Sequence, residues 1–258
     1  MQVDMKGRTA IITGGSKGLG LAIARRYAES GANVFIVARD AAVLEQARAG
    51  LAQLAPQRVG AEPADVATAA GVEAAYAAAM ARFGQVDIVV NNAGISRAGA
   101  FEEVTDEAWQ ADLDLKLFAA IRFVRLAWPQ MKARRWGRVI NVLNIGAKAP
   151  SAKSVPTSVS RAAGMALTKA LAGEGAPFNI LVNALLVGRI ESDQWVRRAQ
   201  ATGQSLETVL EEMGRSIPMG RVGTADEFAS AACFLASDGA SYITGTALNV
   251  DGGASPVV

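Results

Sequence analysis

The feature that most constrains this fold is a regular alternation of short apolar runs with longer alanine-rich segments along the whole chain. The apolar runs have the length of buried strands, and the segments between them carry helical spacing. Such alternation predicts right-handed crossovers and a doubly wound α/β fold, a parallel sheet of about seven strands with helices on both faces. The predicted strands are Thr9–Thr13, Asn33–Ala38, Arg58–Ala61, Asp87–Asn91, Arg138–Leu143, Ile180–Leu186 and Ala247–Val250.

The intervening segments predict helices, and nothing between them divides the chain. A length of 258 residues fits one α/β domain, and no repeat or linker interrupts it. We therefore expect a single domain over residues 1–258. The predicted helices are Leu19–Ser30, Ala41–Ala55, Ala69–Phe83, Asp106–Arg134, Thr157–Gly173 and Thr224–Leu235.

Charge and composition argue against several classes of partner. The net charge is only +2 and the basic residues are scattered, which gives nucleic-acid binding little support. The absence of a signal peptide pattern and of a long apolar run predicts a cytoplasmic protein that does not insert in membranes. Histidine is absent, so no metal site is predicted. The one cysteine, Cys233, has apolar neighbours and is interpreted as a buried, inert thiol.

Two segments depart from the alternation. Asp106–Arg134 is apolar on two sides, which one sheet cannot cover, so a partner subunit is expected in a homodimer or homotetramer. Glu191–Ser216 is a polar, helix-forming insertion after the sixth strand. Ligands in such folds bind beyond the carboxyl ends of the strands, so this insertion is placed like a lid.

A glycine-rich turn directly follows the first predicted strand and opens onto a helix. Glycines let the backbone approach a pyrophosphate, while the helix N-terminus offers unpaired N–H groups and positive potential. A glycine turn with a strand before it and a helix after it predicts a dinucleotide site. The residues assigned to it are Gly14, Ser16, Lys17, Gly18, Leu19 and Gly20.

The end of the second strand bears on which dinucleotide binds. A cofactor without a 2′-phosphate is usually held there by a carboxylate on the ribose, but the expected position holds Ala38 and Arg39 follows it. A guanidinium suits a 2′-phosphate, and Lys17 adds a second cation. NADP is therefore predicted over NAD, with Asp40 as the alternative ribose ligand that would favour NAD.

Further motifs carry a resemblance to a known family. Asp65-Val66 follows the third strand, Asn91-Asn92-Ala93-Gly94 the fourth, and Val250-Asp251-Gly252-Gly253 lies near the end. With the glycine turn, their order and spacing resemble the short-chain dehydrogenase/reductase family over essentially the whole chain, which implies a Rossmann-like fold. The resemblance implies cofactor contacts from Asp65, Val66, Asn92, Ala93, Gly94, Arg161, Gly188, Ile190 and Ser192.

The resemblance also locates the family's reaction site, and there this sequence departs from it. The family uses Asn, Ser, and a Tyr followed four residues later by Lys. The corresponding positions hold Lys116, Asn144, Thr157 and Arg161. Because Tyr27, Tyr76 and Tyr242 all lie elsewhere, the usual phenol mechanism is excluded by this alignment.

The four replacements suggest different chemistry. Thr157 and Asn144 can donate hydrogen bonds to a carbonyl oxygen, and Arg161 can bind ribose hydroxyls or an anion. Lys116 is interpreted either as a replacement proton donor or amine nucleophile, with a pKa lowered by burial, or as a structural residue. Lys148 and Lys153 are further candidates for substrate contact.

Three functions remain open from the sequence. The first is an NADP-dependent oxidoreductase with an altered proton path, acting on a small molecule whose identity the sequence does not indicate. The second is a cofactor-binding sensor or scaffold without catalysis. The third is a lyase or hydrolase on the same fold, which the retained cofactor motifs disfavour.

Overall fold

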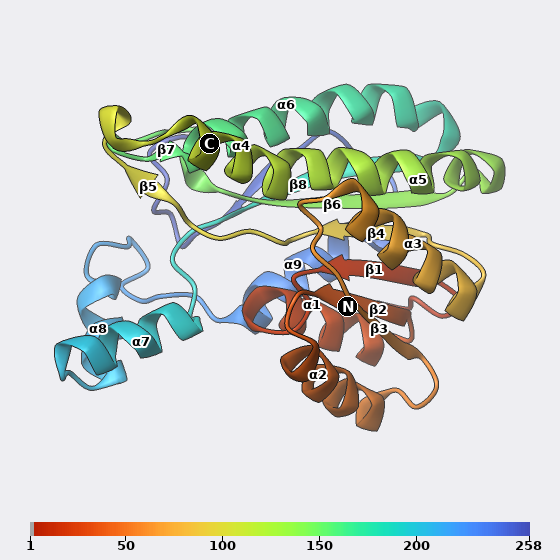
Figure 1. Cartoon of the computed structure of the whole chain (residues 1–258), viewed down its shortest axis with the longest axis horizontal. Coiled ribbons are helices and arrows are strands. Elements are labelled where there is room, and N and C mark those ends of the chain that lie inside the picture. Colours follow the sequence, from red (N-terminus) through yellow and green to blue (C-terminus); the bar gives the residue numbers. More distant parts are fainter. Residues whose placement is uncertain (1–2) are drawn as a thin grey trace.

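The predicted strands form one parallel sheet in a computed structural model that describes residues 3–258. The seven-stranded sheet has the order β3-β2-β1-β4-β6-β8-β9 (Figure 1). From β1 the chain adds β2 and β3 on one side and the later strands on the other, as in a doubly wound sheet. The predicted fold class is confirmed, and each predicted strand exists within a few residues of its expected bounds. They are β1 Thr9–Thr13, β2 Asn33–Ala38, β3 Val59–Pro63, β4 Ile88–Asn91, β6 Gly137–Asn144, β8 Ile180–Val187 and β9 Ala247–Val250.

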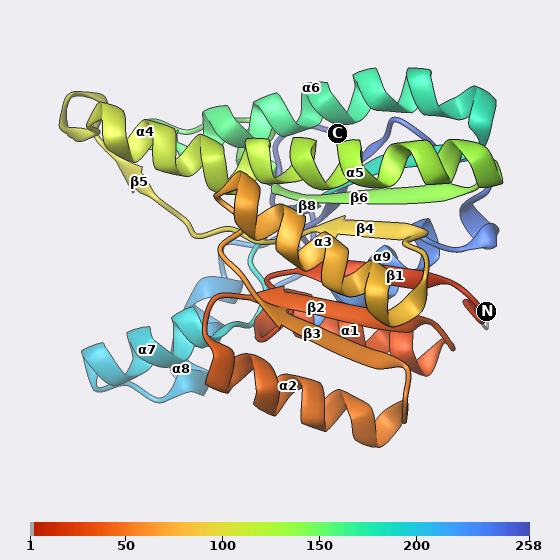
Figure 2. The same cartoon turned by 45° about the vertical axis from the view of Figure 1, so that its right-hand side comes forward.

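Helices cover both faces of this sheet (Figures 1 and 2). One face is covered by α1 (Gly18–Glu29), α2 (Ala41–Leu54) and α9 (Ala225–Leu235). The other is covered by α3 (Ala69–Phe83), α5 (Ala119–Arg134) and α6 (Thr157–Gly175). Because both faces are buried, the central strands β1 and β4 are buried at successive positions rather than at alternate ones.

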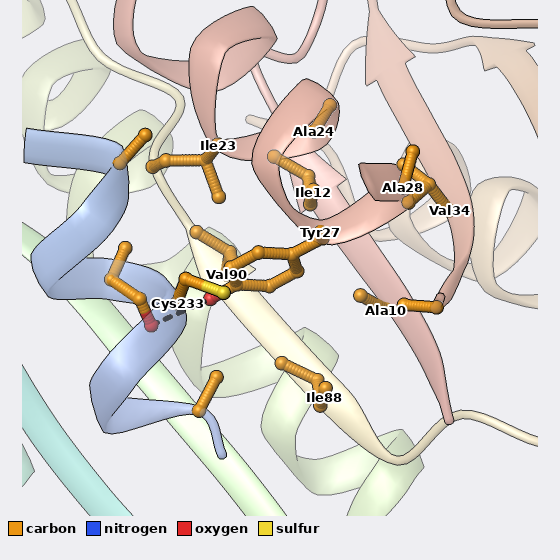
Figure 3. Packing of buried hydrophobic residues seen from close by; sticks show 14 of the residues in the cluster. Ala10, Ile12, Ile23, Ala24, Tyr27, Ala28, Val34, Ile88, Val90 and Cys233 are labelled. Atoms are coloured by element: carbon orange, nitrogen blue, oxygen red, sulfur yellow. Dashed lines mark hydrogen bonds between the residues drawn. The ribbon is translucent and has the colours of Figure 1, made fainter. Parts of the chain in front are cut away.

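The core under α1 and α9 is held by packing and by one buried hydrogen bond (Figure 3). The Tyr27 hydroxyl of α1 donates to the Ala232 carbonyl of α9 at 3.0 Å, which satisfies the only polar atom of that side chain. Cys233 is buried beside it, as predicted. Burial raises the pKa of the Cys233 thiol, so the thiolate is disfavoured and the residue behaves as a core side chain.

The predicted helix over Asp106–Arg134 has the expected bounds, but it contains a π-helical turn that was not predicted. The segment comprises α4 (Asp106–Leu113), a π-helical turn at Asp114–Phe118, and α5. The wider turn buries Lys116, whose ammonium then needs polar partners that an apolar face does not offer. Of the two apolar faces, one packs on the sheet through Phe123, while Phe118 on the other is 40% exposed.

The carboxyl ends of the strands carry two additional units (Figure 1). The predicted helical insertion contains α7 (Asp193–Thr202) and α8 (Leu206–Gly214). A two-stranded antiparallel ribbon of β5 (Ala98–Gly99) and β7 (Val155–Pro156) was not predicted, because two-residue strands carry no periodicity. Short 3₁₀ turns occur at Phe101–Glu103, Ile145–Ala147, Ala176–Phe178 and Asp238–Ala240. Over residues 3–258, no helix has both the length and the apolar character needed to cross a membrane.

Candidate active site

A cleft of about 620 Å³ lies at the carboxyl edge of the sheet. It is bordered by the loops that follow β1, β4, β6 and β8 and by the start of the insertion, which is where a doubly wound sheet places ligands. Most of the residues singled out in the sequence meet there. Those lining the cleft are Gly14, Lys17, Gly18, Leu19, Gly20, Asn92, Ala93, Gly94, Asn144, Thr157, Arg161, Gly188, Ile190 and Ser192.

Five of the predicted catalytic and cofactor-binding residues do not line the cleft, and several lining residues were missed. Those outside the lining are Ser16, Arg39, Asp65, Val66 and Lys116. The missed ones are Ile95, Ser96, Val142, Leu143, Val187, Glu191 and Trp195, although Glu191 and Trp195 belong to the predicted lid. The others are apolar or small side chains, and nothing in the local sequence separates them from core positions.

Two glycines of the turn fill different geometrical needs. A Cβ added at Gly20 would lie 2.2 Å from the Gly14 carbonyl oxygen, so only glycine lets the helix start this close to the turn. Gly18 has φ +51°, and a Cβ there would meet no atom within 4 Å, so its surroundings are open. The turn thus leaves space beside the first N–H groups of α1, which is the shape a pyrophosphate needs.

Asn92 and Thr13 fix this turn to the end of β4. The Asn92 side-chain amide donates to the carbonyls of Thr13 at 2.9 Å and Gly14 at 3.2 Å. The Thr13 hydroxyl in turn accepts from the backbone N–H groups of Asn92 and Ala93, at 3.0 and 2.9 Å. The side-chain role of Asn92 is therefore to hold the floor of the cleft rigid.

Two candidate ligands for the adenosine ribose or its 2′-phosphate, Arg39 and Asp40, follow β2, and they differ in whether they already have partners in the protein. Asp40 caps α2, since its carboxylate accepts from the N–H groups of Ala42 and Val43, each at 3.1 Å. Arg39 is exposed, and within residues 3–258 its side chain has no hydrogen bond or ion pair. The guanidinium is thus free for a ligand, whereas the carboxylate already has backbone partners.

Asp65 and Val66 border the same region from the end of β3. The Asp65 carboxylate accepts from the Ala67 N–H at 3.1 Å and stabilises the turn before α3. Val66 is buried in the core beneath α3 and α5. Of the two, only Asp65 is an exposed side chain.

The insertion closes the opposite side of the cleft. Ile190 pairs with Gly223 in an isolated parallel bridge, and its carbonyl accepts from the Trp195 indole N–H at 2.8 Å. Gly188 lies against Asp251, where a Cβ would come within 2.5 Å of that side chain. These contacts fix the strand-like segment after β8.

Asn144 and Arg161 present unsatisfied polar atoms in the part of the cleft where the sequence predicts the reaction, which we call the reaction end. The Asn144 Oδ1 and the Arg161 Nε are buried without a hydrogen-bond partner among the described residues, and both side chains line the cleft. Arg161 is positioned by its Nη1, which donates to the Val142 carbonyl at 2.9 Å. Burial lowers the pKa of Arg161 to about 10, against the effect of Asp112, so the guanidinium remains charged at neutral pH. Buried polar atoms without partners in a cleft are typical of a ligand site.

Behind the cleft wall, three hydrogen bonds link four side chains in the order Thr157, Lys116, Asp112, Ser160, and we call this group the square. Lys116 pairs with the Asp112 carboxylate and donates to the Thr157 hydroxyl at 2.8 Å. The Ser160 hydroxyl donates to the other oxygen of Asp112 at 2.6 Å. Asp112 and Lys116 lie four residues apart on one helical segment, and Thr157 and Ser160 three apart on α6. The side chains of Asp112 and Lys116 have no exposed surface.

Thr157 is the member of this square that lines the cleft. Its hydroxyl donates to the Arg97 carbonyl at 2.6 Å and accepts from the Arg97 N–H at 3.0 Å, in addition to the bond from Lys116. Burial lowers the pKa of Lys116 to about 8; the cations of Arg161 and Arg97 act in the same direction, and Asp112 opposes them. Asp112 and Ser160 were missed in the sequence, although the spacing of Asp112 and Lys116 is that of a helical ion pair.

Other candidate side chains lie elsewhere. Lys148 donates to the Ala247 carbonyl at 2.7 Å and to the Asn249 side chain at 2.9 Å, so it ties its loop to β9 rather than lining the cleft. Tyr27 is buried under α9, Tyr76 is hydrogen-bonded to Gln130 of α5, and Tyr242 is fully exposed. Among the residues that the structure describes, none of the three tyrosines lines the cleft.

The chain matches one protein family over nearly its whole length. The profile of that family, described as Enoyl-(Acyl carrier protein) reductase, matches residues 14–255. The chain is 38% identical to 3beta-hydroxysteroid dehydrogenase 1 of Eggerthella lenta, over 98% of this chain and 95% of the relative. It is 34% identical to D-beta-hydroxybutyrate dehydrogenase of Cupriavidus necator, over 96% and 98% of the two chains.

Solved structures agree with this match. L-Sorbose reductase from Gluconobacter frateurii, solved with NADPH and L-sorbose, has a TM-score of 0.95 and 35% identity, with both chains fully covered. A short chain oxidoreductase from Pseudomonas aeruginosa, solved with NADPH and containing an atypical catalytic center, has a TM-score of 0.93 and 38% identity over 99% of this chain and 100% of that one. Fold, motifs and relatives agree that this chain belongs to the short-chain dehydrogenase/reductase family.

Proposed function

We propose that this protein is an NADP-dependent oxidoreductase that works without a tyrosine phenol. The observation that carries the proposal is one continuous cleft that joins the glycine turn to Asn144, Thr157 and Arg161. The free guanidinium of Arg39 and the capping role of Asp40 favour a cofactor with a 2′-phosphate. The neighbours solved with NADPH support the same cofactor.

In this proposal the reaction end holds a carbonyl or alcohol substrate by hydrogen bonds. The cofactor supplies or accepts a hydride when bound. The Asn144 amide lines the cleft and can donate to the substrate oxygen, where negative charge develops during reduction. Arg161, charged and incompletely hydrogen-bonded, adds positive potential at the same place.

The proton path in this proposal runs through Thr157 to Lys116. A threonine hydroxyl alone is too weak an acid near neutral pH, but the ammonium bonded to it has a pKa of about 8. For the hydroxyl to donate to a substrate, it turns from the Arg97 carbonyl towards the cleft while Lys116 gives it a proton. Lys116 thereby acts from behind the cleft wall, not as a cleft-lining group.

One observation favours the alternative, a cofactor-binding protein without catalysis. The Thr157 hydroxyl has its donor and acceptor capacity already used by Arg97 and Lys116 within the protein. If this arrangement persists with substrate bound, no proton reaches the cleft. Cofactor would still bind, because the glycine turn and the segment after β8 do not depend on Thr157.

The test combines cofactor binding with turnover. Calorimetry with NADPH establishes binding, and absorbance at 340 nm then follows NADPH oxidation against carbonyl and imine compounds and NADP⁺ reduction by alcohols. Turnover that falls at least ~100-fold in Lys116→Ala and stays unchanged in Lys132→Ala, an exposed lysine on α5, supports the proposal. Tight NADPH binding with no turnover on any compound favours the silent protein.

We also propose that the protein assembles as a homodimer or homotetramer, as predicted from the second apolar face. A groove between α5 and α6 is lined mainly by apolar side chains, with Arg125 and Glu174 also in its lining. The apolar ones are Ile121, Val124, Trp128, Pro129, Leu167 and Leu171. Sedimentation at micromolar concentration should give a species larger than the monomer, and Ile121→Glu should shift it towards monomer. The cytoplasmic location remains a prediction from the sequence.

A further inference from the structure

The buried square of Asp112, Lys116, Thr157 and Ser160 contains one charged residue with no role in the proposed chemistry, Asp112. It does not line the cleft and lies with Lys116 beneath Thr157. Each of its carboxylate oxygens has one side-chain partner, Lys116 for one and Ser160 for the other. A carboxylate with no exposed side-chain surface is costly to bury, so its position calls for an explanation beyond packing.

The charges around Lys116 show what Asp112 does. Two cations act on the ammonium, Arg161 from α6 and Arg97 from the segment before β5. The Thr157 and Ser160 hydroxyls, also on α6, are neutral. Asp112 is therefore the one anion that acts on Lys116 among the described residues. Without it, burial and two like charges would all favour loss of the proton from Lys116.

We propose that Asp112 is a positioning residue that, with Ser160, holds Lys116 as a charged donor against the Thr157 hydroxyl. The square fixes the ammonium in direction, because Asp112 and Thr157 are its two hydrogen-bond partners. It also fixes Asp112, because Ser160 binds the oxygen that Lys116 does not. The proton-donor role of Lys116 rests on the proposed function, but the charge and position of Lys116 do not.

The sign of the pH effect follows from these contacts. The pKa of Lys116 in the folded protein, about 8, lies below the ordinary value of 10.5. Below pH 8 the charged lysine therefore costs folding free energy, and that cost falls as pH rises from about 8 towards 10.5. Removing the Asp112 charge lowers the pKa of Lys116 further. The folding free energy that a charged Lys116 costs then becomes larger, and the pH range over which this cost changes extends to lower pH.

The experiment titrates Lys116 directly in the apo protein. The chain has only seven lysines, so lysine labelled with ¹³C at Cε gives few NMR signals, and Lys116→Met identifies the one that matters. We expect a midpoint near 8 in the wild type and a midpoint lower by about 1–3 pH units in Asp112→Asn. The control Asp114→Asn removes a partly exposed carboxylate two residues away and should move the midpoint by less than about 0.3 unit.

Asp112→Asn is studied downward from pH 9, where its lysine is neutral and folding is expected. If the variant unfolds on acidification, the unfolding midpoint itself reports the protonation of a lysine without its counter-ion, and Asp114→Asn should not unfold there. An unchanged Lys116 midpoint, with no added acid sensitivity, overturns the inference. Where a substrate is found, the alkaline limb of the rate profile should move to lower pH with the NMR midpoint. An NMR shift without any turnover refutes the proposed function and leaves the role of Asp112 standing.

Discussion

The two ends of the cleft are built in different ways. At the cofactor end, glycines and backbone groups provide the shape, and Asn92 and Thr13 hold it through main-chain hydrogen bonds. At the reaction end, side chains provide nearly everything, through Asn144, Arg161 and the square around Lys116. The first end carries the motifs by which the sequence resembles its family, and the second is where the sequence predicts a departure from the family's residues.

This difference shows which features of a fold tolerate exchange of residues. A turn in which a Cβ would lie 2.2 Å from a carbonyl oxygen admits glycine and little else. A hydrogen-bonded network admits other residues if all its members change together. Lys116 is accompanied by Asp112, whose carboxylate balances the charge that Lys116 introduces. The reaction end therefore behaves as a unit, and its residues are best tested as a unit.

The largest expected effect comes from converting the reaction end to the family's residues. We predict that Lys116→Asn, Asn144→Ser, Thr157→Tyr and Arg161→Lys together fold poorly, because Asp112 then loses its buried cation. Breaking a buried ion pair on one side typically costs about 3–5 kcal/mol. Adding Asp112→Asn should recover most of this loss, as measured by urea unfolding of both variants.

The variant that carries all five substitutions, the four above and Asp112→Asn, should also reduce simple ketones faster than the wild type. A positioned general acid typically contributes 10²–10⁴-fold, so we expect a rise of roughly 100-fold or more in NADPH oxidation at 340 nm. The aromatic ring at position 157 must displace the Arg97 backbone from its present contact, so Thr157→Tyr alone should give little. A wild-type protein that already reduces ketones rapidly, indifferent to Lys116→Ala, would contradict the picture of an altered acid.

The shape of the cofactor end is tested by adding a methyl group at Gly20, where the glycine turn leaves no room for a Cβ. Gly20→Ala places a Cβ against the Gly14 carbonyl, so the turn and the start of α1 must separate. We predict a loss of roughly 100-fold in NADPH affinity, which corresponds to about 2.7 kcal/mol. The matched control is Gly50→Ala on α2, where a Cβ meets no atom within 4 Å. That variant should bind NADPH as the wild type does, and calorimetry compares the two.

Most of the sheet could be predicted from sequence because most of its strands are short, largely apolar runs that are followed by a turn. The π-helical turn at Asp114–Phe118 could not be predicted, because its apolar spacing is that of an ordinary helix over so few residues. What distinguishes it is the burial of Lys116, a tertiary property. The β5–β7 ribbon could not be predicted for a related reason, since its pairing joins residues that lie far apart in sequence.

The candidate site likewise contains residues that can be recognised in the sequence and residues that only the packing brings together. The glycine turn and Asn92 are recognisable in sequence because their roles come from backbone geometry at fixed spacing. Asp112 and Ser160 are not, since only the packing of α6 against α4 brings them together. Lys116 was singled out from the sequence, but its separation from the cleft by Thr157 could not be predicted, because that separation depends on the same packing.

A smaller effect is expected from Arg39, which tests the cofactor preference. Arg39→Ala removes the free guanidinium at the end of β2, so NADPH should bind roughly 10- to 100-fold more weakly while NADH affinity changes little. Calorimetry with both cofactors measures the ratio. Equal losses for NADPH and NADH would mean that Arg39 acts on a part common to both, and not on the 2′-phosphate.

The smallest effect is expected from Asp40, and it separates the two ribose ligands. Asp40→Asn keeps a side chain that caps helices as well as aspartate does, so α2 should keep its stability in urea unfolding. The substitution removes a negative charge beside Arg39. NADPH affinity should therefore rise, by roughly two- to fivefold at low salt, and the gain should shrink as salt screens exposed charges. NADH affinity should stay the same, because the Asp40 carboxylate is bound to the N–H groups of Ala42 and Val43. A fall in NADH affinity would show that this carboxylate leaves its cap to hold a ribose, and NAD would then rank with NADP as a cofactor.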